Sequence, residues 1–143
     1  MKTLIDSKQS LDTELMNKII SFDYSDTIRA LLAKEPGFDT NQWLGEFQKF
    51  IYFRVKLNQN FHVPSHRLDR VWHAMIMDTA QYQLFNATVS PDGFIHHRSV
   101  SKQFSDQDIA SSKVKLSALA ISTFGQDFTW DKSRAAICWC STD

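Results

Sequence analysis

All five histidines of this 143-residue chain lie between positions 62 and 97, in a stretch that could bind a metal ion. Asp69 and His73 are four residues apart, so in a helix their side chains are neighbours. His96 and His97 follow closely enough in sequence to fold back onto that helix. A carboxylate beside an imidazole raises its basicity and fixes its tautomer, which prepares the imidazole for metal binding or proton transfer. Imidazole and carboxylate groups suit zinc, iron or nickel. We therefore expect a transition-metal site, with zinc as first choice and Asp69 as a ligand or as the partner of a ligand.

The same residues allow a second interpretation that needs no metal. The histidine and aspartate side chains would then form hydrogen bonds that hold the loop against the helix. The protein would be a non-enzymatic interaction or accessory module that works with a protein partner. With a metal, an open coordination position would instead support hydrolysis of an unidentified small molecule. The spacing matches neither a zinc finger nor a His-Glu-x-x-His helix, so the sequence leaves both interpretations, and the question of enzymatic activity, open.

The two cysteines and four glycines indicate little further chemistry. Cys138 and Cys140 could supply thiolates to a soft metal, or belong to a terminal segment with one buried thiol, which is the interpretation we favour. They are too close in sequence to staple the fold, so we expect a reduced, cytoplasmic protein. The glycines form no phosphate-binding loop, and the sequence contains no Gly-x-Ser-x-Gly nucleophile motif.

The composition argues against several classes of protein. Lys plus Arg and Asp plus Glu each number 16, so the net charge is zero and nucleic acid is not expected as a partner. No run of about 18 apolar residues could span a membrane, and the first residues do not resemble a signal peptide. We therefore expect no membrane association, and a protein or a small molecule as the partner.

Apolar residues at helical spacing predict an all-α protein, with about five helices in one bundle-like domain over residues 1–143. Capping signals mark the ends: Asp39 starts the third helix, Ser105 and Asp108 form a capping box for the fifth, and Gly125 ends it. The fourth helix is expected to be the longest, with a His-His loop after it. The second helix is expected to start after Ser25, its N-cap, and to stop at Pro36-Gly37. The other expected helices run from Ser10 to Ser21, from Asp39 to Asn58, from Ser65 to about Phe85, and from Ser105 to Phe124.

The fourth expected helix has two faces. Its apolar face is centred near Met75 and includes Trp72, which we expect in the core. His66, Asp69 and His73 fall on a stripe roughly opposite. This pattern predicts that the Asp69 and His73 side chains lie on the helix surface.

Residues 63–97 combine several short motifs: a Pro-Ser pair, an acidic residue three before a Trp-His pair, an Asp-Thr pair, a tyrosine and a Phe-Ile-His-His sequence. This combination resembles the glycine-rich domain-containing protein-like family, which occurs as small bacterial proteins and as part of larger plant proteins. The residues that carry the likeness are Pro64, Ser65, Asp69, Trp72, His73, Asp78, Thr79, Tyr82, Phe94, Ile95, His96 and His97.

The likeness covers about residues 40–140 and includes the aromatic third helix and a Phe-Gly pair followed by tryptophan and cysteines. It implies a shared fold but no reaction, because the family has no established activity. Met75 stands where many relatives have a second histidine. Four residues are expected to support the site structurally: Trp72, Asp78, Thr79 and Tyr82.

Overall fold

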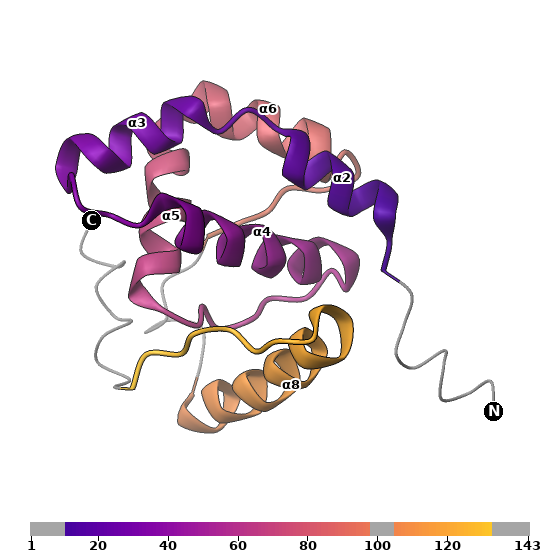
Figure 1. Cartoon of the computed structure of the whole chain (residues 1–143). Helices are drawn as coiled ribbons and strands as arrows, with labels where there is room; N and C mark the ends of the chain where they lie inside the picture. Colours follow the sequence, from indigo (N-terminus) through magenta and orange to yellow (C-terminus); the bar gives the residue numbers. More distant parts are fainter. Residues whose placement is uncertain (1–10, 98–104, 133–143) are drawn as a thin grey trace.

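The computed structural model describes residues 11–97 and 105–132. Helices hold 68% of these residues and no strand occurs among them, which confirms the all-α prediction (Figure 1). The described ranges contain six helices, where about five were predicted. The helices are α2 (Thr13–Ser21), α3 (Ser25–Lys34), α4 (Thr40–Lys56), α5 (His66–Met77), α6 (Thr79–Val89) and α8 (Asp106–Phe124).

Several helix ends form where the sequence places them. Asp39 caps α4 by accepting a hydrogen bond from the Gln42 backbone N–H at 3.1 Å. Ser105 and Asp108 form the predicted capping box, in which each side chain accepts from the other residue's backbone N–H. Gly125 ends α8 with a φ of 79°, a left-handed conformation that glycine adopts without a Cβ penalty. These three predictions are confirmed.

Two predicted helix starts differ from the structure. The first helix was expected from Ser10, which lies outside the described residues. Instead Asp12 caps α2 by accepting from the Leu15 N–H at 3.1 Å. Ser25, the expected cap of the second helix, is instead the first residue of α3, and Tyr24 is the N-cap without a side-chain capping bond. The Asp23 carboxylate accepts from both the N–H and the hydroxyl of Ser25.

The helix expected from Ser65 to about Phe85 is broken into α5 and α6 at Asp78. This residue has non-helical dihedral angles, φ −98° and ψ 88°, and its side chain accepts from the Gln81 N–H at 3.2 Å. Aspartate competes with the helical backbone for such bonds and therefore favours helix starts. The expectation that this would be the longest helix is wrong, since α8, with 19 residues, is longer than either piece.

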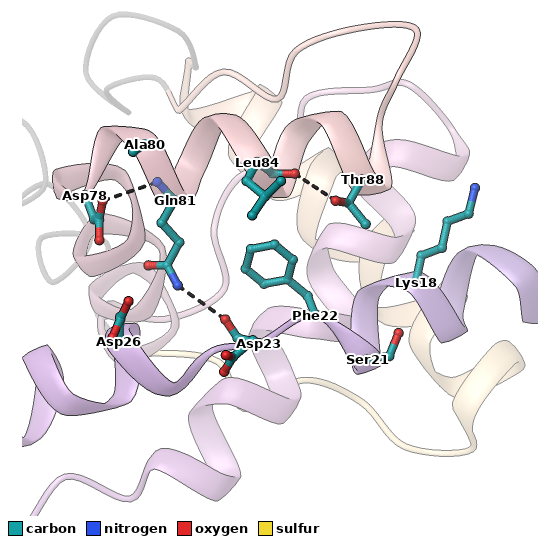
Figure 2. A pocket seen from close by; sticks show the side chains of 10 residues that line it. All are labelled: Lys18, Ser21, Phe22, Asp23, Asp26, Asp78, Ala80, Gln81, Leu84 and Thr88. Carbon is teal, nitrogen blue, oxygen red and sulfur yellow. Dashed lines mark hydrogen bonds between the residues drawn. The ribbon is translucent and has the colours of Figure 1, made fainter.

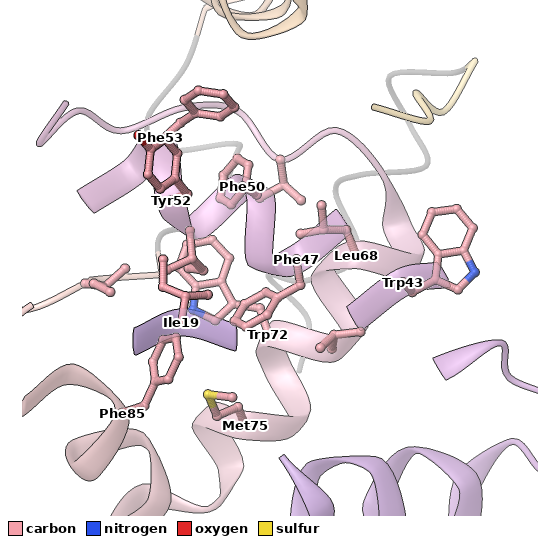
Figure 3. Close-up of a cluster of buried hydrophobic side chains, with 14 of the residues drawn as sticks. Ile19, Trp43, Phe47, Phe50, Tyr52, Phe53, Leu68, Trp72, Met75 and Phe85 are labelled. Carbon is pink, nitrogen blue, oxygen red and sulfur yellow. The ribbon is translucent and has the colours of Figure 1, made fainter. Parts of the chain in front are cut away.

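Aromatic rings fill the core between α4, α5 and α6 (Figure 3). Phe47 and Phe50 of α4 are fully buried, and their ring centroids lie 6.4 and 5.6 Å from that of Trp72 on α5. Phe85 of α6 packs 6.0 Å from Phe47. Burial of this many large rings is the main stabilising contribution in such a helical domain.

The helix α8 covers the other side of α4 (Figure 1). Its last residue, Phe124, packs edge-on against Tyr52 and Phe53 at the end of α4. Ser112 on α8 accepts a hydrogen bond from the backbone N–H of buried His62, in the link between α4 and α5. Among the described helices none is long and apolar enough to cross a membrane.

Candidate functional site

The centre of the candidate site is a contact between Asp69 on α5 and His97, after α6. The Asp69 Oδ1 atom lies 2.6 Å from the His97 Nε2 atom. Asp69 is only 1% exposed, and its Oδ2 atom is buried without a hydrogen-bond partner in the described part of the chain. The prediction that Asp69 lies on the helix surface is therefore wrong, because the segment that contains His97 returns over this side of α5.

The His97 ring is also held by an aromatic contact. Its centroid lies 4.6 Å from that of Trp72, in an edge-on arrangement with an interplanar angle of 75°. Asp69 and Trp72 are three residues apart on α5 and so project from neighbouring positions on one side of the helix. Together the two side chains hold the imidazole: Asp69 through a polar contact and Trp72 through a ring contact.

A second set of hydrogen bonds holds the backbone next to His97. The Trp72 indole N–H donates to the Tyr82 hydroxyl at 3.0 Å, and that hydroxyl donates to the Ile95 carbonyl oxygen. The Ile95 N–H donates to the Asn86 Oδ1 atom at 2.6 Å, while the Asn86 amide donates to the Tyr82 carbonyl. Both backbone polar groups of buried Ile95 are thus satisfied by side chains of α6.

The Tyr82 hydroxyl keeps its proton in this network. Burial raises the pKa of Tyr82 above its ordinary value, and the Trp72 and Asn86 hydrogen bonds oppose this only in part. Because the hydroxyl is neutral at physiological pH, it can accept from Trp72 and donate to Ile95 simultaneously. Tyr82 therefore links the core helix α5 to the segment after α6.

The other two predicted ligands, His73 and His96, do not complete a metal site with Asp69 and His97 among the described residues. His73 is half-buried on α5, and His96 is exposed, with its ring 5.0 Å from the Phe94 ring. Within residues 11–97 and 105–132 no three His, Cys, Asp or Glu residues are placed to hold one metal ion. The structure thus joins Asp69 and His97 but does not gather all four predicted ligands. Cys138 and Cys140 lie outside the described residues.

The residues expected to support the site have different roles. Trp72 is 3% exposed and belongs to both the core and the site, and Tyr82 is the centre of the hydrogen-bond network. Asp78 caps α6, and Thr79 is the exposed first residue of that helix. Sequence reasoning missed Asn86, although an asparagine inside a helix, where it is a poor helix former, is a signal of a side-chain role.

His66 is a fourth imidazole near the site, at the first turn of α5. Partial burial and the nearby Arg70 guanidinium lower its pKa, and the Asp131 and Asp69 carboxylates oppose that shift. The His66 backbone N–H donates to the Asp131 carboxylate at 2.5 Å. The segment that follows α8 therefore passes beside the start of α5 at Asp131.

No protein-family model matches this sequence, and neither the curated proteins nor the solved structures gave a significant match. The resemblance to the glycine-rich domain-containing protein-like family stays a prediction.

Proposed function

We propose that this chain is a small non-enzymatic interaction module in which Asp69 and His97 hold the residue 94–97 segment against α5. We call this pair the Asp69–His97 latch. The observation that carries the proposal is the 2.6 Å contact made by a carboxylate that is 1% exposed. A buried hydrogen bond to a charged group stabilises a fold by about 1.5–3 kcal/mol. That is enough to keep a short segment in one position.

The neighbouring hydrogen bonds support a positioning role. The bonds that involve Trp72, Tyr82 and Asn86 end on the Ile95 backbone. This pattern fixes a chain segment through its backbone. A segment fixed before binding loses less conformational entropy when a partner arrives.

The latched segment presents an aromatic pair for such a partner. Phe94 is 46% exposed, and its ring lies beside the exposed His96 ring and edge-on to Tyr82. Aromatic side chains that are rigid before binding are frequent energetic centres of protein interfaces. The latch would thus act by presenting Phe94 and His96 in a set orientation.

Hydrogen exchange at the Ile95 amide tests this role. In a His97→Ala variant this amide should exchange about tenfold or more faster, relative to the core amides of α4, because the segment opens locally. The exchange is read residue by residue by NMR. His96→Ala is the matched control and should leave the Ile95 rate unchanged. If Ile95 is equally protected in both variants, the latch does not hold the segment.

One observation favours a second candidate function, which is metal binding. The buried Asp69 Oδ2 atom has no hydrogen-bond partner within the described residues, and such an atom is costly to leave unsatisfied. A carboxylate hydrogen-bonded to a histidine is also the arrangement found behind many metal-bound imidazoles. His97 would then be a ligand through its second ring nitrogen, and His73 the next candidate on α5.

Metal addition separates the two candidates. The protein, purified without chelator, is offered Zn²⁺, Ni²⁺, Fe²⁺ or Mn²⁺ and measured by elemental analysis and thermal unfolding. Metal binding predicts about one bound equivalent and a gain of about 2.7 kcal/mol at 100 times Kd, both abolished by His73→Ala. The affinity should fall below about pH 6, since ligand imidazoles must be neutral. The latch alone predicts no bound metal and an unchanged melting temperature.

A further inference from the structure

A surface groove of about 580 Å³ runs between α2, the start of α3 and the outer side of α6 (Figure 2). Its volume lies in the range of about 300–1,000 Å³ that is typical of pockets for drug-sized ligands. It is formed by the side of α6 that faces away from Tyr82, so it is separate from the Asp69–His97 latch. The residues that matter for its chemistry are Lys18, Phe22, Asp23, Asp26, Asp78 and Leu84.

The middle of the groove is apolar. Figure 2 shows Phe22 and Leu84 facing each other from opposite walls. The Phe22 ring is fixed from behind by edge-on contacts with Tyr24 and Phe85, at 5.3 and 5.1 Å. Leu84 is 61% exposed. An apolar side chain placed between them would therefore bury surface on both walls without any change in the core.

One end of the groove is acidic. Asp23, Asp26 and Asp78 surround this end in Figure 2, and Lys18 lies at the other. The Oδ1 atoms of the three aspartates accept hydrogen bonds from Ser25, the Arg29 guanidinium and the Gln81 N–H, respectively.

The second oxygen of each of these carboxylates is available to a ligand. Over the described residues the three Oδ2 atoms accept no hydrogen bond. The hydrogen bonds from Ser25 lower the pKa of Asp23, which keeps that carboxylate ionised at neutral pH. The described residues offer no three-ligand metal group here, so the acidic end fits an organic cation better than a metal ion.

We propose that this groove binds an extended peptide segment of a partner protein that carries an arginine or lysine close to an apolar residue. The cation would lie among the three carboxylates and the apolar side chain between Phe22 and Leu84. Charge complementarity carries the choice of occupant. Three aspartates and one lysine line the groove, and the acidic end stays net negative although the Arg29 guanidinium pairs with Asp26 at 2.7 Å. The inference extends the proposed interaction role to a second surface and is independent of the latch.

Fluorescence anisotropy with the full chain tests the proposal. The probe is a fluorescein-labelled peptide, Gly-Ser-Ala-Arg-Ala-Leu-Ala-Ser-Gly, and its counterpart has glutamate in place of arginine. The arginine peptide should bind about tenfold tighter than the glutamate peptide, and its binding should weaken as salt screens the charges. In NMR spectra the amides of Phe22 and Leu84 should shift when the arginine peptide is added.

Variants assign the binding to the groove. Asp23→Asn with Asp26→Asn keeps the local hydrogen bonding of Asp23 and should weaken binding about twofold to fivefold for each charge removed. Leu84→Ser should weaken it about tenfold. Asp92→Asn, in the exposed turn after α6, is the matched charge control and should bind like the wild type.

The peptide-binding experiment tests the groove independently of the Asp69–His97 latch. A His97→Ala protein should still bind the arginine peptide, so a failure of the latch leaves this test readable. Equal affinity for the two peptides, no binding of either, or amide shifts confined to other surfaces would each overturn the proposal.

Discussion

Replacing Trp72 with alanine should lower the free energy of unfolding by about 3–5 kcal/mol, the largest effect that we expect from one substitution. The side chain is 3% exposed and packs against Phe47 and Phe50, so its removal leaves a cavity in the core. It also removes the hydrogen-bond donor to Tyr82 and the aromatic contact with His97. Urea unfolding followed by circular dichroism measures the change.

The control for this prediction is Trp72→Phe. Phenylalanine keeps much of the ring packing but has no indole N–H, so this variant should lose about 1–3 kcal/mol. A loss of less than about 1 kcal/mol for the alanine variant would show that Trp72 is not a core residue, since truncation of a large core side chain costs more.

The His97→Ala protein should lose about 3 kcal/mol of unfolding free energy, although His97 lies outside the helices. The loss is large because the substitution leaves both oxygens of buried Asp69 without a partner in the described structure. A buried carboxylate that loses its partner retains the full cost of its desolvation. Urea unfolding at neutral pH gives the value.

His96→Ala is again the matched control. His96 is exposed and next in sequence, and its replacement should change the unfolding free energy by no more than about 0.5 kcal/mol. If the two alanine variants were equally stable, the Asp69–His97 contact would contribute nothing measurable to the fold.

The helix ends that depend on neighbouring residues were the most predictable part of the fold. Asp39, the Ser105–Asp108 capping box and Gly125 act within three residues of the helix that they start or end, so their effect can be inferred from the sequence. The break at Asp78 has a similar local signal, an aspartate three residues before a glutamine. The apolar spacing continues across it, from Met75 to Tyr82 and Phe85, and this periodicity favoured one long helix.

The sequence identified residues of the candidate site but not how they are arranged. The sequence singled out Asp69 and His97, but a helical wheel assigns one buried face to each helix. It therefore placed Asp69 on the surface. Its burial depends on residues 94–97 returning over α5, and the role of Asn86 depends on the backbone of Ile95, nine residues away. Such contacts arise from the tertiary fold, and the same is true of the groove between α2 and α6.

A double-mutant cycle between Asp69 and His97 tests the latch most directly. It compares the unfolding free energies of the wild type, Asp69→Ala, His97→Ala and the protein with both substitutions. The latch predicts that the double variant loses about 1–3 kcal/mol less than the sum of the single losses, because the contact can be broken only once. Losses that add to within about 0.5 kcal/mol would show that the two residues are energetically independent and would contradict the latch.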